Sequence, residues 1–293
     1  MIEDVIIIGA GPAGVATAIQ LSLYGIRPVV FEKDRVGGLI KNANLIENYP
    51  GFVNGISGRD FVKLLERQLE RISANVVFDE VLEVNIENTT FVVKTRRTSV
   101  YTKYLVIGSG TKPKSPAIKI PRVAMDKVFY EIYPLIEVKN KKIAIVGSGD
   151  AAFDYALTLE KQNQITILNR SEKLKCRPLL FEKISRSINV IYKPNSEITE
   201  IINSEDDIIL NYTSNYGDEK IQVDYVVFAI GREPQLSFIS SEMKPHISEL
   251  ELDGNLYFIG DVKNSIFRQV AISMGDGILA AMKIYQKIKG EYL

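Results

Sequence analysis

The hydrophobic and polar positions near the start of the chain follow the order expected for a strand, a helix and a second strand. The apolar run Val5–Ile8 leads into the glycine-rich segment 9–14, which a helix-like stretch over 15–24 follows. A second apolar run, 28–31, comes after a glycine. Short runs of β-branched residues bounded by glycine predict buried strands, so this segment is predicted to form one βαβ unit.

The same order returns in the middle of the chain. It predicts an apolar strand over 142–146, a glycine turn over 147–152, a helix over 153–160 and a further strand over 165–168. Two copies of one unit indicate two similar modules and not a solenoid. We therefore expect an α/β fold with two Rossmann-like, doubly wound dinucleotide-binding modules.

The remaining segments are shorter and mostly strand-like. Helices are expected over much of 15–75, around a loop at 42–58. Alternating apolar and polar positions predict strands over 76–78, 81–86, 91–95, 99–101 and 104–107, and further short strands between 189 and 230. A last strand is predicted over 256–259 and a last helix over 274–288, whereas residues 112–127, rich in Pro and Lys, are expected to form a linker.

The first glycine-rich segment has the spacing of a dinucleotide fingerprint. Gly9 permits a tight turn, Gly11 lets the backbone approach a pyrophosphate, and Gly14 allows helix and strand to pack closely. Glu32 ends the second strand, where a carboxylate can accept both hydroxyls of an adenosine ribose. The expected site also includes Pro12, Ala13 and Lys33.

The second glycine-rich segment departs from the first at the strand that follows it. Ala152 takes the place of the third glycine, which the fingerprint permits, and the expected contacts are Gly147, Ser148, Gly149, Asp150, Ala151 and Ala152. Asn169 and Arg170 end the next strand, and Lys173 and Lys175 follow. Because an arginine binds a 2′-phosphate that an acid would repel, this pattern favours NADPH over NADH. The alternative is a solvated basic loop.

Composition and charge exclude several classes of function. The chain has 293 residues, of which 46% are hydrophobic, and 36 basic residues balance 36 acidic ones, so no global field favours nucleic acid or a membrane. A single cysteine, Cys176, makes an intramolecular disulfide impossible. A single histidine, His246, rules out multi-histidine metal sites, and no metal is expected. The acidic start does not resemble a signal peptide, so a cytoplasmic location is expected.

Several further segments carry a resemblance to a known family. They are residues 46–52, Gly37-Gly38, the turn 108–111, residues 229–234, the segment 257–262, and Arg268-Gln269-Val270-Ala271 followed by 275–277 and 280–281. In this order they resemble the low-molecular-weight thioredoxin reductases, and the resemblance runs nearly end to end.

The resemblance implies a domain arrangement and a set of cofactor contacts. The flavin module is expected to be discontinuous, over 1–113 and 236–293, with the nicotinamide module over 114–235 and hinges near 111–116 and 231–236. A homodimer is also implied. The contacts added for FAD are Gly38, Leu39, Asn48, Gly110, Thr111, Gly260, Asp261, Arg268, Gln269 and Val270, and those added for NADPH (NADH being possible) are Gly231 and Arg232.

The departures from the family bear directly on function. Members that reduce thioredoxin carry a Cys-x-x-Cys pair, and alignment on the strand 142–146 places that pair on Tyr130 and Tyr133. A dithiol relay needs two sulfurs, so the chain is not expected to be a conventional thioredoxin reductase. The family's His-Arg-Arg-x-x-x-Arg loop is represented here by Asn169, Arg170, Ser171 and Lys175, with one phosphate-binding cation missing.

Three hypotheses about function remain open at this point. The first is an FAD-dependent NAD(P)H oxidoreductase that reduces an external acceptor without protein thiols, most specifically a ferredoxin–NADP reductase of the thioredoxin-reductase-like type, because that relative also lacks the cysteine pair. The second is an enzyme that reduces oxygen, a quinone or free flavin. The third is a non-catalytic redox sensor. No catalytic side chain is expected, since the cofactors supply the chemistry.

Three features of the sequence allow two interpretations each. The basic residues between Lys112 and Lys127 either steer an acidic electron carrier such as a ferredoxin or form a solvated linker face. Tyr130 and Tyr133 either shield the flavin or serve packing. Cys176 is either a redox-sensitive thiol beside cations or a packing residue.

Overall fold

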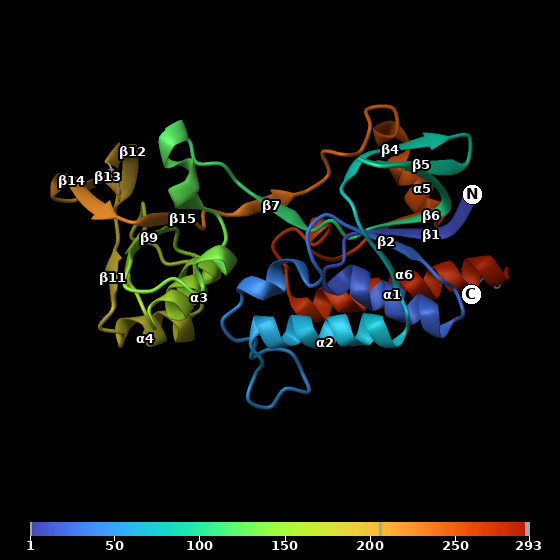
Figure 1. The fold of residues 1–293 in the computed structure, drawn as a ribbon, viewed down its shortest axis with the longest axis horizontal. Coiled ribbons are helices and arrows are strands. Elements are labelled where there is room, and N and C mark those ends of the chain that lie inside the picture. Colours follow the sequence, from blue (N-terminus) through green and yellow to red (C-terminus); the bar gives the residue numbers. More distant parts are fainter. Residues whose placement is uncertain (1, 205–206, 291–293) are drawn as a thin grey trace. The chain divides into compact units, whose positions relative to one another are not determined.

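A computed structural model describes residues 2–204 and 207–290 of the chain (Figure 1). The chain divides into two compact units. The first unit comprises residues 1–41, 47–112 and 233–293, and the second comprises residues 42–46 and 113–232. The expected borders after 113 and 235 are thus replaced by borders after Lys112 and Arg232, and the segment Asn42–Ile46, expected in the first module, groups with the second unit.

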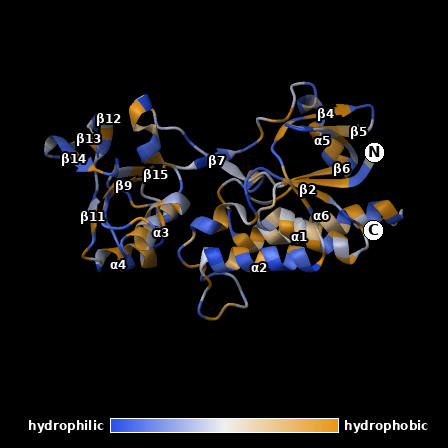
Figure 2. Ribbon diagram, in the orientation of Figure 1, coloured by the Kyte–Doolittle hydropathy of each residue, from blue (hydrophilic) through white to orange (hydrophobic). Residues whose placement is uncertain are grey.

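The first unit is built on a seven-stranded mixed sheet with the order β3-β2-β1-β6-β5-β4, and β17 also pairs with β6. Its parallel strands are β1 (Ile2–Ile8), β2 (Val29–Glu32), β3 (Asn75–Phe78), β6 (Ser99–Ile107) and β17 (Leu256–Phe258). The antiparallel strands are β4 (Val81–Glu87) and β5 (Thr90–Thr95). β5 pairs with β6, and β4 pairs with β5 at the edge of the sheet. Hydrophobic residues run along β1, β2 and β6 (Figure 2).

Three helices lie together on one side of β1, and β4, β5 and α5 (Ile247–Leu252) lie on the other (Figure 1). The three are α1 (Pro12–Leu23), α2 (Gly58–Arg71) and α6 (Val270–Lys289). α2 begins at the N-cap Ser57, whose side chain accepts a hydrogen bond from the Asp60 N–H at 3.1 Å, and it buries an apolar stripe that includes Phe61 and Leu65.

Gly277 allows α1 and α6 to pack closely. A Cβ atom at Gly277 would lie 2.2 Å from the Ala13 carbonyl oxygen, so a side chain cannot fit there. The Thr17 hydroxyl also donates to the Gly277 carbonyl at 3.1 Å. α1, the helix that follows the first glycine turn, therefore packs directly on α6, which lies near the end of the chain.

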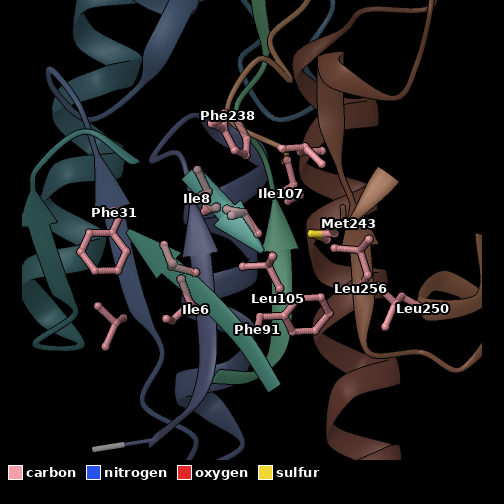
Figure 3. Close-up of a cluster of buried hydrophobic side chains, with 14 residues drawn as sticks. Ile6, Ile8, Phe31, Phe91, Leu105, Ile107, Phe238, Met243, Leu250 and Leu256 are labelled. Carbon is pink, nitrogen blue, oxygen red and sulfur yellow. The ribbon is translucent and has the colours of Figure 1, made fainter. Parts of the chain in front are cut away.

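The core of the first unit combines residues from both ends of the sequence (Figure 3). Ile6 and Leu105, on the central strands β1 and β6, are fully buried. Phe238, Met243 and Leu256, from the C-terminal segment, pack into the same cluster. The sheet is therefore not complete without residues beyond 233.

The second unit contains a parallel five-stranded sheet with the order β11-β10-β9-β15-β8. Helices α3 (Asp150–Leu159) and α4 (Pro178–Ser185) pack on one hydrophobic cluster, which contains Phe153 and Ile165. A second cluster, with Ala144 and Tyr212, lies against the three-stranded sheet β12-β13-β14. The strands are β8 (Val128–Phe129), β9 (Lys142–Val146), β10 (Gln164–Leu168), β11 (Val190–Lys193), β12 (Glu197–Ser204), β13 (Asp207–Ser214), β14 (Gly217–Val223) and β15 (Tyr225–Phe228).

The two connecting segments pair with each other. β7 (Thr111–Pro113) and β16 (Arg232–Pro234) form a two-stranded sheet, and the Lys112 ammonium lies 3.2 Å from the Glu233 carboxylate. The predicted α/β class with two Rossmann-like modules is confirmed by the parallel strands β3-β2-β1-β6 of the first sheet and by the parallel five-stranded sheet of the second unit. Within the described ranges, no helix is both long and apolar enough to cross a membrane.

Candidate functional site

The first glycine turn has the close contacts that its sequence predicts. Gly9 has a φ of +101°, its N–H donates to the Phe31 carbonyl at 2.7 Å, and a Cβ there would lie 2.4 Å from the Gly108 carbonyl oxygen. A Cβ at Gly14 would lie 1.9 Å from the Gly9 oxygen. At Gly11, the N-cap of α1, a Cβ would meet nothing within 4 Å, and no side chain caps the helix. The N-terminus of α1 therefore leaves room for an anion beside its N–H groups.

The Glu32 carboxylate is fixed by two backbone hydrogen bonds at the end of β2. One oxygen accepts from the Ala10 N–H at 2.8 Å, and the other accepts from the Asp34 N–H at 2.9 Å. Each carboxylate oxygen has lone pairs for a further donor. Glu32 is thus held next to the glycine turn, where an acceptor for ribose hydroxyls is needed.

Two segments far away in the sequence lie against this turn. A Cβ at Gly38 would lie 3.4 Å from the Gly11 Cα, and one at Gly260 would lie 2.9 Å from the Ala13 Cβ. Together with Gly108, these contacts bring four glycine-containing segments of the first unit to one place. The residues therefore fit the phosphate-bearing half of a dinucleotide.

The Gly260-Asp261 turn is held by side chains whose role in it the sequence did not indicate. The Gly260 N–H donates to the Asp276 carboxylate at 3.0 Å, and the Asn264 amide donates to the Gly260 carbonyl at 3.0 Å. The Ser273 hydroxyl donates to the Asp261 carboxylate at 3.2 Å. These bonds join the turn to α6, so Asp261 has a fixed orientation at the start of that helix.

The other predicted flavin residues also lie in the first unit. Asn48 donates to the Gln269 side chain at 2.6 Å, and Lys33 donates to Gln235 at 3.3 Å. Gly110 has a φ of +66°. Thr111 is buried, Leu39 and Arg268 are half-buried, and Pro12 and Val270 begin α1 and α6.

The second glycine turn repeats the construction of the first. The Gly147 N–H donates to the Leu168 carbonyl at 3.0 Å, its φ is +145°, and a Cβ there would lie 2.4 Å from the Ala229 oxygen. Gly149 again caps the helix, with nothing within 4 Å of a Cβ. Ser148 is buried and Ala151 is exposed, while Ala152 is fully buried against the sheet. The second unit thus has a second dinucleotide turn of the same design.

The comparison with protein families identifies the chain. Residues 3–277 match the family described as pyridine nucleotide-disulphide oxidoreductase. The chain belongs to this family. The thioredoxin reductase of Mycoplasma genitalium is 26% identical, over 98% of this chain and 96% of that protein. A Clostridium pasteurianum protein named "34.2 kDa protein in rubredoxin operon" is 27% identical, over 98% of each chain.

A solved structure agrees with the fold of this oxidoreductase. The crystal structure of Lactococcus lactis thioredoxin reductase is similar with a TM-score of 0.87, at 23% identity, over 98% of this chain and 99% of that one. The predicted resemblance to the low-molecular-weight thioredoxin reductases is confirmed, and the oxidoreductase is a flavoprotein of that type. FAD and NADPH are the cofactors of this family.

The segment that the sequence resemblance aligns with the family's dithiol contains Tyr130 and Tyr133. Tyr130 packs on Phe228 with ring centroids 6.1 Å apart, and burial raises the pKa of Tyr130. The Tyr133 N–H donates to the Asn42 side chain at 2.9 Å. Between them, Glu131 accepts from the Asn42 amide at 3.1 Å and lies 3.2 Å from the Arg232 guanidinium. This network fixes the segment within the second unit.

The loop after β10 is organised by Asn169, which is buried. Its amide donates to the Lys173 carbonyl at 3.3 Å and to the Tyr192 hydroxyl at 2.9 Å, and its oxygen accepts from the Ser171 N–H at 3.3 Å. The buried Asn169 side chain therefore holds the loop in its conformation. The cations at positions 170, 173 and 175 are exposed, and no ion pair found in 2–204 and 207–290 includes them.

The end of the same loop folds back onto the glycine turn. The Lys175 N–H donates to the Ser148 carbonyl at 3.0 Å, and the Arg177 N–H donates to the Asp150 carboxylate at 2.7 Å. The Arg177 Nε also lies 2.9 Å from the second Asp150 oxygen. Between these residues, Cys176 is half-buried, and burial raises the pKa of its thiol. The Arg177–Asp150 contact was not predicted from the sequence, where its only signal is an acid in the first turn of the helix after the second glycine turn.

The remaining residues singled out in the sequence lie on connecting segments and on the surface. Gly231 has a φ of +108° beside the connecting strands, and His246 lies on the surface near Glu249. In the basic stretch, Lys112 is paired, whereas Lys119 and Arg122 are exposed and line a hollow with Thr199, Glu200 and Ile201. No group of three or more His, Cys, Asp or Glu side chains that could hold a metal ion occurs in the part of the chain that the structure describes.

Proposed function

We propose that this oxidoreductase passes electrons from NADPH through FAD to an external acceptor without a redox-active dithiol. The observation that carries the proposal is the segment 130–133. Tyr130 and Tyr133 stand at the family's dithiol positions, and the sole cysteine, Cys176, lies on the loop after β10. Since thiol–disulfide exchange needs two sulfurs that can meet, the chain alone cannot carry out the thioredoxin reductase relay.

Under this proposal the first unit binds FAD. The α1 N-terminus takes the diphosphate, and the Glu32 carboxylate accepts hydrogen bonds from the adenosine ribose hydroxyls. Asp261, oriented by Ser273, takes the flavin side chain. The residues assigned to FAD are Gly9, Gly11, Pro12, Ala13, Gly14, Glu32, Lys33, Gly38, Leu39, Asn48, Gly110, Thr111, Gly260, Asp261, Arg268, Gln269 and Val270.

The second unit binds NADPH under the same proposal. The α3 N-terminus takes the diphosphate, and Arg170 and Lys175, which are exposed on the loop after β10, bind the 2′-phosphate. Asn169 holds the loop that carries them. The residues assigned to NADPH are Gly147, Ser148, Gly149, Asp150, Ala151, Ala152, Asn169, Arg170, Lys175, Gly231 and Arg232.

The chemistry belongs to the cofactors, and the chain supplies position. When bound, FAD takes up a hydride from NADPH and can release the electrons one at a time. A one-electron protein carrier is therefore the proposed acceptor, as in a ferredoxin–NADP reductase. The name of the Clostridium pasteurianum relative, which refers to a rubredoxin operon, supports a small iron–sulfur carrier. The exposed Lys119 and Arg122 provide positive charge for an acidic partner.

A homodimer is also part of the proposal. α6 exposes the apolar side chains Ile272, Ile278, Leu279 and Met282. Such a stripe on one helix suits a partner helix. Sedimentation of the FAD-loaded protein at micromolar concentration is expected to give a mass of two chains, and a monomer at every concentration would contradict this.

The experiment that tests the function is anaerobic reduction followed by addition of acceptors. NADPH is expected to bleach the flavin absorbance within seconds, and ferredoxin or rubredoxin is expected to restore it. Thioredoxin is expected to restore nothing. Restoration by quinone or oxygen alone would indicate a small-molecule acceptor. A flavin that NADPH does not bleach would indicate a non-catalytic nucleotide sensor and contradict the proposal.

A further inference from the structure

We propose that Arg177 is a diphosphate-binding residue of the nicotinamide nucleotide site and acts on NADPH and NADH alike. This inference rests on the proposed function, because it places a dinucleotide on the second glycine turn. Its basis is the contact of Arg177 with Asp150, through a backbone bond of 2.7 Å and a side-chain approach of 2.9 Å. The ligand class is the diphosphate of a pyridine dinucleotide, whether or not it carries a 2′-phosphate.

The position of Asp150 creates an electrostatic problem that Arg177 solves. Asp150 is the first residue of α3, and its N-cap Gly149 has open space in front of it. This helix N-terminus is where the fingerprint places a diphosphate. A carboxylate at the first helical position would repel that diphosphate. The Arg177 guanidinium offsets this repulsion through its Nε contact with the carboxylate, and its other nitrogens carry further N–H donors for a phosphate.

The backbone conformation of the loop after β10 determines whether Arg177 can contact the diphosphate or the 2′-phosphate of the nucleotide. Bonds from the Lys175 N–H to Ser148 and from the Arg177 N–H to Asp150 fasten residues 175–177 to the glycine turn. Arg170 instead follows the end of β10, at the ribose side, next to the buried Asn169. The loop therefore holds Arg177 at the diphosphate, whereas Arg170 lies at the 2′-phosphate.

A purely structural role for this ion pair is a weak alternative. Both side chains are about half exposed, at 55% for Arg177 and 46% for Asp150. Exposed ion pairs contribute little to the free energy of unfolding. Removal of the Arg177 side chain is therefore expected to leave the melting temperature nearly unchanged while it weakens nucleotide binding.

The test compares Arg177→Ala with Arg170→Ala in the full-length, FAD-loaded protein. Dissociation constants for NADPH and NADH are measured by calorimetry under anaerobic conditions, together with the melting temperature. Arg177→Ala is expected to weaken both nucleotides by the same factor, about tenfold. Arg170→Ala is expected to weaken NADPH by a similar factor and NADH hardly at all.

Two further variants separate charge from shape. Arg177→Lys is expected to retain most of the affinity for both nucleotides. Asp150→Asn introduced into Arg177→Ala is expected to recover part of the lost affinity, because it removes the repelling carboxylate. Equal affinity of Arg177→Ala and wild type for NADH, or a loss confined to NADPH, would overturn the inference alone. A wild-type protein that binds neither nucleotide would overturn the proposed function together with it.

Discussion

The side chain of Asn48 donates a hydrogen bond of 2.6 Å to the side chain of Gln269, although 221 residues separate them in the sequence. Asn48 lies in the loop before α2, and Gln269 is the N-cap residue of α6. The bond therefore ties the piece 47–112 of the first unit to the piece 233–293. Both residues are assigned to FAD, so the same contact fixes two expected flavin ligands relative to each other.

Removal of the Glu32 carboxylate is expected to weaken FAD binding. Glu32→Ala deprives the Ala10 and Asp34 N–H groups of their acceptor and removes the ribose contact, which we expect to cost about 1–3 kcal/mol in FAD affinity. Glu32→Gln, which keeps one oxygen acceptor, is the matched control and should lose less. Equilibrium dialysis followed by flavin absorbance measures the affinity. Equal FAD affinity of all three proteins would contradict the assignment of Glu32.

A methyl group at Gly277 is expected to push α1 and α6 apart. In Gly277→Ala the new Cβ would lie 2.2 Å from the Ala13 oxygen and 2.8 Å from the Thr17 hydroxyl, and overpacking of this kind costs about 1–3 kcal/mol. Gly275→Ala is the control on the same helix, because its Cβ would meet nothing within 4 Å. That variant should gain about 0.5–1 kcal/mol from helix propensity. Urea unfolding of both variants checks the difference, and equal effects would show that α1 and α6 can separate freely.

Replacement of the only thiol is expected to leave electron transfer intact. Cys176→Ser changes a half-buried residue whose pKa is raised by burial, so the thiol is a poor nucleophile at neutral pH. NADPH-driven reduction of a one-electron dye should stay within a factor of about two of the wild-type rate, because hydride transfer between the cofactors needs no thiol. A large loss of dye reduction, with the fold and FAD content preserved, would mean that the thiol takes part.

Acid is expected to destabilise the three-stranded sheet of the second unit through Glu219. A hydrogen bond from the Ser214 hydroxyl, with further bonds from Tyr212 and Lys193, lowers the pKa of Glu219 from 4.5 to about 2. Since the folded pKa lies below the unfolded one, this stabilisation is complete above about pH 4.5 and is lost as the pH falls toward 2. The difference in melting temperature between wild type and Glu219→Gln should therefore shrink over that range. A difference that is constant from pH 7 to pH 3 would contradict the assigned bonds.

The sequence predicted both glycine turns correctly because their requirements are local. Gly9 and Gly147 have a positive φ, and at each of them a carbonyl oxygen occupies the space that a Cβ atom would need. Apolar runs next to such turns form parallel strands in both units. These features depend on neighbouring residues, so composition and spacing were sufficient to find them.

Other features depended on contacts that spacing does not reveal. The predicted strands 99–101 and 104–107 are one strand, β6, because the Thr102 hydroxyl donates to the Asp4 and Tyr104 carbonyls and lets a polar residue stay buried. α6 begins at Val270 and not near 274, and its added first turn includes Ser273, whose hydroxyl donates to the distant Asp261 carboxylate. The Arg177–Asp150 contact joins residues 27 positions apart through a loop conformation that no periodic pattern describes.

The division of the first unit into separate sequence pieces has a consequence for synthesis on the ribosome. Every residue of the second unit precedes position 233, whereas β17 and the core residues Phe238, Met243 and Leu256 of the first unit come afterwards. The second unit can therefore fold while the first unit still lacks its last strand. Until then β6 has an open edge and β1 lies beside an incomplete core, which is the kind of surface that chaperones recognise. A chain truncated after residue 232 should thus contain one protease-resistant unit and one protease-sensitive N-terminal segment.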